Sequence, residues 1–190
     1  PISKDIPCNV ISLLKVRDGR LHWTQIMRSN DIMRGLPNNI IQFTMLQEVM
    51  ASWLKCDLGE YFHLSDSLHI YDRDTQKFLV APYPSYSTKR NNFSLGYDQS
   101  NMLFASIYED LKVVANGNCD ESQLRVIFDR DSKKNSSRCG LIRDIMAVIG
   151  SDAARRYGFK VLAYEFAESC TDLDLRSAAM AWLKERGVPE

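Results

Sequence analysis

The sequence lacks the features that mark several classes of protein. No apolar run approaches the length that crosses a membrane, and no charged start is followed by the hydrophobic run of a signal peptide. Its 24 basic residues are balanced by 24 acidic ones, so the chain has no overall charge suited to nucleic acid or acidic lipid. We therefore expect neither nucleic acid nor a membrane as a partner.

The cysteines also lack a pattern. There are five, an odd number, and no two are separated by the two residues typical of a zinc-binding pair. This spacing argues against a disulfide framework and against a zinc site, and the three histidines lack metal-binding spacing. We predict no bound metal, and thiols kept reduced in the cytoplasm.

The first part of the chain is predicted to be rich in strands. Residues 8–16 are mostly β-branched and aliphatic, residues 17–20 contain the Asp-Gly pair of a tight hairpin, and residues 21–29 alternate as the return strand. A helix is predicted over 38–55, capped by Asn38 or Asn39 and ended by residues 57–59. A further strand is predicted over 60–71, with a bulge or a bend at Ser65–Asp66.

The second part is predicted to be mostly helical. Helical spacing covers residues 101–115, 121–128, 141–157 and 173–186, whereas 159–166 is compatible with a strand or a helix. Residues 81–92 and 129–138 are polar and predicted to be loops. The fold class is therefore α+β, with a first segment over 1–75 and a helical region over 76–190 that belongs to the same compact domain or to a second one.

Several side chains of the first segment could do chemistry. Cys8 follows a proline at a strand start, where a thiolate could act as a nucleophile, although a buried structural cysteine is the commoner case. Arg28 beside Ser29 is a natural grip for a phosphate. A surface arginine at the end of a strand is the plain alternative.

Four further residues could bind a ligand. The amide of Asn39 can read the edge of uracil, although both Asn39 and Asp31 are also good capping residues. His69 and Tyr71 are two apart, so in a strand they share a face and could bond a sugar hydroxyl; a half-buried pair that satisfies itself is the alternative. His22 and His63 have no comparable partners in the sequence.

The order of these residues resembles the thymidylate synthase family. That family carries a Pro-Cys nucleophile, a hairpin, a Gln-Arg-Ser-x-Asp cluster, Gly-x-Pro-x-Asn at a helix start and then His-x-Tyr. Here the same series reads "IPC", "MRSND", "GLPNN" and "HIY", with no insertion or deletion between motifs over residues 6–71. The resemblance implies a thymidylate-synthase-like mixed sheet packed with helices.

The resemblance also implies a role for each matching residue. Cys8 is the nucleophile that adds to C6 of the pyrimidine, and Asp31 orders the base. Arg28 and Ser29 hold the nucleotide phosphate, Asn39 contacts the base at N3 and O4, and His69 with Tyr71 bonds the sugar 3′-hydroxyl. In the family, Asn at the position of Asn39 accompanies uracil, whereas a cytosine-specific hydroxymethylase has Asp there.

The implied reaction is one-carbon transfer to C5 of a pyrimidine nucleotide monophosphate from 5,10-methylenetetrahydrofolate, in a homodimer. Hydride transfer from the folate would give a methyl group, which we favour, and addition of water would give a hydroxymethyl group. A hairpin with its strands side by side explains how Cys8 meets the ring while Arg28 holds the phosphate. The alternative from another functional class is a catalytically inactive relative that only binds the nucleotide.

The sequence departs from the family around the base. Asn9 stands where the family usually has His, Met27 where it has Gln, and Asn38 where an aromatic is common, while Asp66 and Ser67 replace a Gly-Asp pair. Only seven residues precede Cys8, whereas the family has a long region there with further arginines and a catalytic glutamate. We expect that region to be missing or to lie outside this sequence. The motif comparison ends at Asp74.

Overall fold

The computed structural model describes residues 7–79, 93–128 and 140–188. The chain divides into two compact units, residues 1–84 and residues 85–190, and each unit is described by itself. The elements confirm the predicted α+β class. The loops predicted over 81–92 and over 129–138 lie outside the described residues.

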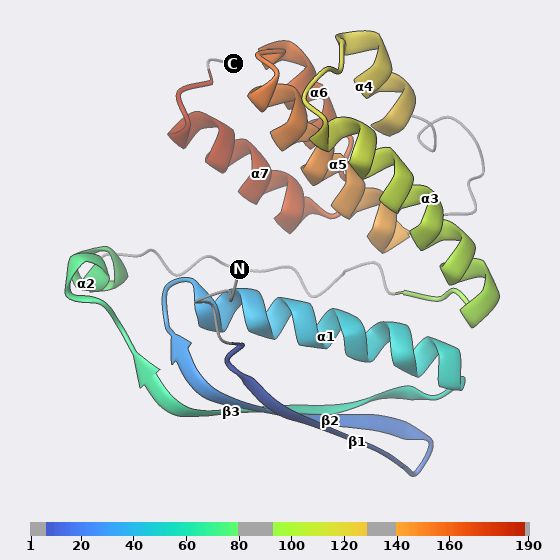
Figure 1. Ribbon diagram of the computed structural model, residues 1–190, viewed down its shortest axis with the longest axis vertical. Helices are drawn as coiled ribbons and strands as arrows, with labels where there is room; N and C mark the ends of the chain where they lie inside the picture. Colours follow the sequence, from blue (N-terminus) through green and yellow to red (C-terminus); the bar gives the residue numbers. More distant parts are fainter. Residues whose placement is uncertain (1–6, 80–92, 129–139, 189–190) are drawn as a thin grey trace, which may run out of the picture. The chain divides into compact units, whose positions relative to one another are not determined.

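The sheet of the first unit has three strands, in the order β1-β2-β3 (Figure 1). Strand β1 (Asn9–Arg17) pairs antiparallel with β2 (Arg20–Asp31), and β2 pairs parallel with β3 (Asp57–His69). The predicted hairpin is confirmed: Asp18 and Gly19 have φ angles of 49° and 72°. A two-residue turn with positive φ at both positions matches the twist of the flanking strands.

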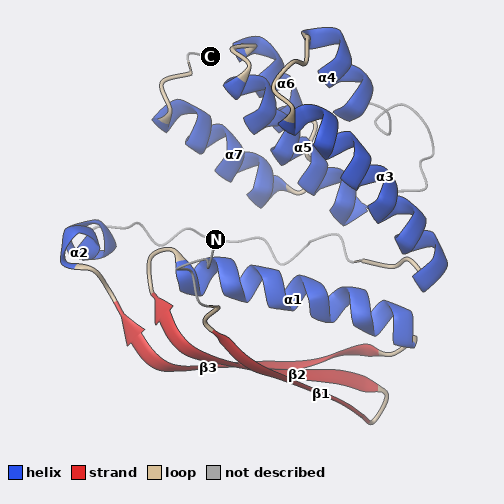
Figure 2. Cartoon of the chain, in the orientation of Figure 1, coloured by secondary structure: helices blue, strands red, loops and turns tan. Residues whose placement is uncertain are grey.

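Helix α1 (Gly35–Leu54) lies along one face of this sheet (Figure 2). Strand β2 alternates buried and half-buried residues up to Met27, as a strand with one covered face must. Trp23 and Met27 from β2 pack with Phe43 of α1, and the rings of Trp23 and Phe43 have centroids 6.0 Å apart. This small core holds the helix against the strands that carry the predicted site residues.

The ends of α1 differ from the prediction. The helix begins at Gly35, preceded by Arg34, and no side chain caps it, so the predicted capping by Asn38 or Asn39 is wrong. Pro37 explains the earlier start, because a proline is well tolerated in the first turn of a helix. The helix ends at Leu54, followed by Lys55 in the left-handed region, and residues 57–59 open β3 rather than ending the helix.

Strand β3 runs through the predicted bend at Ser65–Asp66 without interruption. Ser65 pairs with Met27 and Ser67 with Ser29 along the neighbouring strand, and this ladder keeps the backbone extended despite the weak strand preference of serine and aspartate. A short helix, α2 (Asp72–Leu79), follows the strand where no helix was predicted. The buried carboxylate of Asp74 lies in its first turn.

The second unit is helical, with α3 (Tyr97–Ala115), α4 (Glu121–Phe128), α5 (Gly140–Arg156), α6 (Lys160–Glu168) and α7 (Leu173–Glu185). The ambiguous segment 159–166 is helical because Leu162, Phe166 and their neighbours at helical spacing are buried. Gly150 of α5 is needed where helices approach closely: a Cβ there would lie 2.8 Å from Cγ of Phe128.

None of the helices in the described ranges combines the length and apolar character that crossing a membrane requires. The same ranges hold no group of three or more His, Cys, Asp or Glu side chains suited to a metal ion.

Candidate active site

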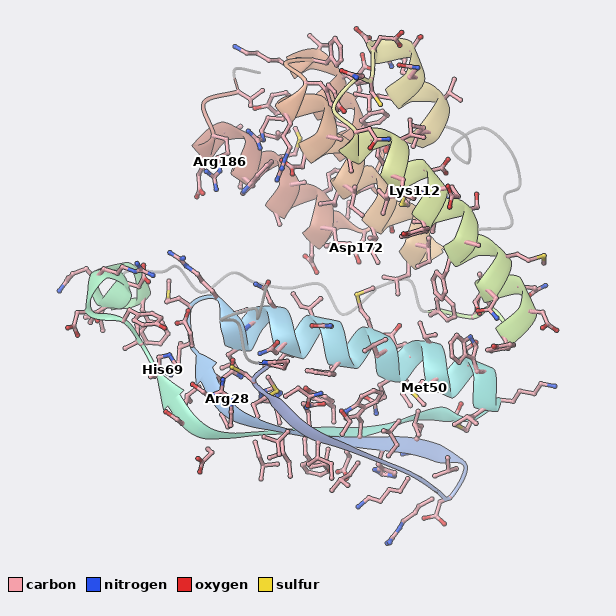
Figure 3. The ribbon with its side chains drawn as sticks, viewed as in Figure 1. Arg28, Met50, His69, Lys112, Asp172 and Arg186 are labelled. Carbon is pink, nitrogen blue, oxygen red and sulfur yellow. The ribbon has the colours of Figure 1, made fainter. Side chains whose placement is uncertain are left out.

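The seven predicted site residues converge on one edge of the sheet. Strand β1 begins where its antiparallel partner β2 ends, and the parallel strands β2 and β3 end together. The backbone N–H of Arg28 donates to the carbonyl of Cys8 at 2.9 Å, and Asp31 pairs with His69. Figure 3 shows Arg28 and His69 near this edge, with Met50 toward the other end of the sheet.

Cys8 and Arg28 are neighbours across the hairpin, as the sequence predicted. Cys8 is half-buried and packs against the cluster of Trp23, Met27 and Phe43. The side chain of Arg28 is exposed, and its Nε donates to the carbonyl of Pro7 at 3.3 Å. The cation is therefore held beside the chain segment that carries the thiol.

Asn9, which stands where the family usually has His, belongs to a polar cluster beneath the hairpin. Its Oδ1 accepts a hydrogen bond from Nε2 of Gln25, which is fully buried. Oε1 of Gln25 accepts from Oγ of Ser12 at 2.6 Å and from Nε1 of Trp23 at 3.2 Å. The bonds to Gln25 fix the start of β1 next to Cys8, because a buried amide stays in place only when its groups are paired.

Ser29 and Asp31 lie at the end of β2. Ser29 is half-buried and pairs with Ser67 of β3. Oδ1 of Asp31 accepts from the backbone N–H of Met33 at 3.0 Å, so this carboxylate closes the turn from β2 toward α1. A short polar side chain often bonds the backbone two residues on in this way.

His69 and Tyr71 contact each other at the end of β3. Their rings meet edge to face with centroids 5.2 Å apart. His69 is the last residue of the strand, whereas Tyr71 follows it and is 49% exposed. The backbone N–H of Asp74 donates to the carbonyl of Tyr71 at 2.8 Å, and the buried carboxylate of Asp74 lies 3.9 Å from Nη2 of Arg34. These contacts place Tyr71 between α2 and the turn before α1.

Asn39 is bonded to a line of polar side chains that the sequence analysis missed. Its Nδ2 donates to Oδ1 of Asn30 at 3.1 Å. Nδ2 of Asn30 lies 2.9 Å from Nε2 of His63, whose Nδ1 lies 2.8 Å from the hydroxyl of Tyr61. The expectation that His63 lacks partners is therefore wrong.

The alternation of polar residues along β3 could have indicated this line from the sequence. Tyr61, His63 and Ser65 alternate along the strand, so they share one face. Burial lowers the pKa of His63 below its ordinary value. Burial also raises the pKa of Tyr61 to about 12. Both side chains are neutral at neutral pH.

A cavity of about 460 Å³ lies in the second unit, apart from the seven residues. It is lined by residues of α3 and α5 that include Asp152 and Arg156. Oδ2 of Asp152 accepts from Nε of Arg156 at 2.8 Å and its Oδ1 accepts from Nη2 of Arg155 at 2.8 Å. The charged groups of this cavity satisfy one another, whereas the sheet edge gathers a thiol, a cation and an amide.

Comparison with known proteins gives the same family as the motifs. The sequence profile of the thymidylate synthase family matches residues 4–124, which extends beyond Asp74, where the motif comparison ended. A deoxyuridylate hydroxymethyltransferase of Bacillus phage SP01 is 41% identical over 70 residues, 36% of this chain and 18% of the relative.

Two further matches carry the same family name. A thymidylate synthase of Staphylococcus haemolyticus is 29% identical over 111 residues, 57% of this chain and 33% of the relative. The solved structure of thermostable thymidylate synthase A from Bacillus subtilis is 28% identical, covers 43% of this chain and 31% of its own, and has a TM-score of 0.40. The chain thus spans a third or less of the length of these relatives.

Proposed function

Because the chain belongs to the thymidylate synthase family, we propose that it is a transferase acting on C5 of a pyrimidine nucleotide monophosphate. The one-carbon donor is 5,10-methylenetetrahydrofolate, and the favoured base is uracil. The observation that carries this proposal is the pairing of Cys8 with Arg28, whose backbones are joined by a 2.9 Å hydrogen bond. A nucleophile and a phosphate-binding cation are thereby held next to each other.

In the proposed reaction, the thiolate of Cys8 adds to C6 and makes C5 a carbon nucleophile. C5 forms a bond to the one-carbon unit and loses its proton to a base, and the bond from that carbon to the folate nitrogen breaks. Hydride from the folate, or water, then adds to the resulting methylene carbon, and the Cys8 thiolate leaves as the C5=C6 double bond re-forms. Asp31 orders the base during these steps. Binding of the phosphate positions the ring for attack, so remote binding energy assists the chemistry.

The remaining residues are proposed to bind the nucleotide. Arg28 and Ser29 hold the phosphate, because a guanidinium beside a hydroxyl matches its oxygens. Asn39 reads the base edge from the start of α1, and His69 with Tyr71 bonds the sugar hydroxyl. The exposure of Arg28 and Tyr71 supports these roles, since both side chains are open to a ligand.

The favoured product carries a 5-methyl group, formed when the folate donates a hydride. A 5-hydroxymethyl product is the second candidate. It is favoured by the phage relative, whose name describes a deoxyuridylate hydroxymethyltransferase and whose 70 matched residues are 41% identical. The two reactions share the steps at Cys8 and differ only in whether hydride or water completes the transfer.

We also propose that the protein acts as a homodimer. The face of the sheet opposite α1 carries two rows of side chains that pair across the strands, Ile11–Ile26–Leu64 and Leu13–Thr24–Phe62. All of them except Thr24 are apolar. Leu13 is 50% exposed and Phe62 47%. An apolar sheet face of this kind is the surface that a second copy would cover.

The two parts of the chain are proposed to differ in role. Residues 1–75 form the catalytic segment, and the helical residues 76–190 support it or its assembly. We also propose a cytoplasmic setting, because the five cysteines are odd in number and widely spaced, as is typical of thiols kept reduced.

The test of the proposed function is tritium release from C5-labelled dUMP, UMP, dCMP and CMP with methylenetetrahydrofolate present. We expect release from dUMP, because bond formation at C5 must expel its hydrogen, and mass spectrometry of the product then separates methyl from hydroxymethyl. Cys8→Ala should abolish release while nucleotide binding persists. Binding without release in the unmodified protein would instead identify an inactive relative, and full activity of Cys8→Ala would overturn the assignment.

A further inference from the structure

Behind Asn39 lies a line of hydrogen-bonded side chains that joins α1, β2 and β3. It is half-buried, apart from Asn30 at its centre. Asn30, at the end of β2, is 2% exposed. Its Oδ1 accepts from Asn39 at 3.1 Å, while its Nδ2 lies 2.9 Å from Nε2 of His63 and donates to Oγ of Ser65 at 3.2 Å. His63 is in turn bonded to the Tyr61 hydroxyl at 2.8 Å.

The polarity of these bonds is set by the donors and acceptors available. The amide nitrogen of Asn30 can only donate, so Nε2 of His63 accepts and the ring proton resides on Nδ1, facing the oxygen of Tyr61. Oδ1 of Asn30 is then left to accept from Asn39. Rotating the Asn39 amide by half a turn would set two acceptors against each other in a buried place, which is costly.

The backbone at the start of α1 restricts the orientation of the Asn30 side chain. A Cβ added at Gly35 would lie 2.6 Å from Oδ1 of Asn30, so the start of α1 packs directly on the amide. A side chain bonded by three partners and covered by backbone keeps one orientation. Asn30 is therefore a fixed acceptor aimed at Asn39.

We propose that Asn30, held by His63 and Ser65, is a positioning residue that keeps the Asn39 amide in the orientation that selects uracil over cytosine. This inference rests on the proposed binding of a pyrimidine at Asn39. With one N–H of its amide committed to Asn30, Asn39 presents its oxygen to the N3–H of uracil and its second N–H to O4. Cytosine offers an acceptor at N3 and a donor at N4, the reverse pattern, and meets like groups.

The first experiment is a binding measurement with the whole chain. The affinities of dUMP and dCMP are measured by calorimetry for the unmodified protein and for Asn30→Leu, Asn30→Asp and Asn101→Leu. Asn30→Leu removes the acceptor, so we expect the preference for dUMP to fall at least tenfold. Asn30→Asp keeps an acceptor toward Asn39 and should retain the preference. Asn101→Leu makes the same change of side chain at an exposed position of α3 and should also retain it.

The ratio of the two affinities is the informative quantity, because a purely structural defect would weaken both nucleotides alike. An unchanged ratio in Asn30→Leu, with preference for dUMP in the unmodified protein, would overturn the inference and leave the proposed function standing. Failure of the unmodified protein to bind any of the nucleotides would overturn both.

A second measurement needs no nucleotide. The nitrogen chemical shifts of the His63 ring in labelled protein identify which nitrogen carries the proton. In the unmodified protein we expect the Nδ1–H tautomer of His63 at neutral pH. In Asn30→Leu we expect the Nε2–H tautomer to replace it. Finding the Nε2–H form in the unmodified protein would reverse the line of bonds and overturn the inference, whatever the nucleotide results.

Discussion

Among single residues, Asn39 has a proposed role, the choice of base, that depends on the orientation of a single amide. Its Nδ2 is committed to Asn30, so the donor and acceptor that remain are defined by one bond. A carboxylate at the same place would have no hydrogen to give to O4 of uracil, and it would accept from the amino group of cytosine.

Asn39→Asp is therefore expected to lower kcat/KM for dUMP by about 10- to 100-fold, since a lost bond to a buried polar group costs about 1–3 kcal/mol. The value for dCMP should fall less or rise. Steady-state tritium release with both nucleotides measures the two constants. An unchanged ratio of the constants would remove Asn39 from the choice of base.

His63 provides a prediction about pH and stability. Burial lowers its pKa in the folded protein below the ordinary 6.5, so the unfolded chain binds the proton more readily. The stabilising effect is fully present above pH 6.5 and is lost as the pH falls through the lowered pKa. Urea unfolding is measured between about pH 7.5 and 5, the range over which a histidine titrates. As the pH falls, the free energy of unfolding should decrease more steeply in the unmodified protein than in His63→Gln. Equal slopes would contradict this.

The sequence was sufficient to pair Cys8 with Arg28 but not to find Asn30. A two-residue turn sets the register of the hairpin and so brings the start of β1 to the end of β2. The irregularity between Asn9 and Ile11, which shifts this register by one residue, is seen only in the structure. Asn30 is bonded to His63, 33 residues further along. The alternation of β3 places His63 on one face of its strand, but it does not show that the end of β2 lies beside it. A polar residue at a strand end looks like surface until the neighbouring strand is placed.

At the scale of whole elements, helix existence was predictable and helix ends were less so. The predicted helix over 121–128 is confirmed without change as α4, because Leu124, Ile127 and Phe128 form one buried stripe. The start of α1 was missed because no side chain caps it. Helix α2 was missed because it is short and polar, and its first turn is set by the contacts of Asp74 with Arg34 and Arg73.

The junction of α5 with α7 depends on one buried carboxylate. Asp144 is fully buried, and its oxygens accept from the backbone N–H of Thr171 at 2.8 Å and of Asp172 at 3.2 Å. Asp172 in turn caps α7, accepting from the N–H groups of residues 174 and 175. The carboxylate on α5 thus holds the cap of another helix in place.

Asp144→Ala should lower the free energy of unfolding by about 3 kcal/mol, because backbone donors lose their acceptor at roughly 1–3 kcal/mol each. Urea denaturation followed by circular dichroism measures the change. Glu168→Ala, at an exposed position of α6, is the matched control and should change stability by less than about 0.5 kcal/mol. Equal effects of the two variants would show that the Asp144 carboxylate is not a critical contact.

For the molecule as a whole, the two faces of the sheet have opposite characters. One is covered by α1 and holds Trp23 and Met27, whereas the other presents the apolar rows described above. Isolated exposed apolar residues are ordinary on protein surfaces, but contiguous rows on a sheet mark an interaction surface.

Light scattering coupled to size exclusion should therefore give the mass of a dimer. Phe62→Lys places a charge at the β3 end of one row and should shift the mass to that of the 21.8 kDa monomer, because an unpaired charge in a dry interface is strongly unfavourable. Val161→Lys, at a position 72% exposed on α6, controls for added charge. A monomer in the unmodified protein would contradict the proposed dimer.

The parallel pairing of β2 with β3 also determines the order in which the site can assemble during folding. The β1–β2 hairpin closes through two residues, on a timescale of about 1–10 μs for such units. Strand β3 can join only after the chain has passed through α1, and contacts that distant in sequence form more slowly. Cys8 and Arg28 therefore meet early, while Asn30, His69 and Tyr71 wait for the last strand. A nascent chain that has not yet reached Asp57 can hold the thiol beside the cation, but Asn30 and Asn39 still lack the strand whose side chains position them.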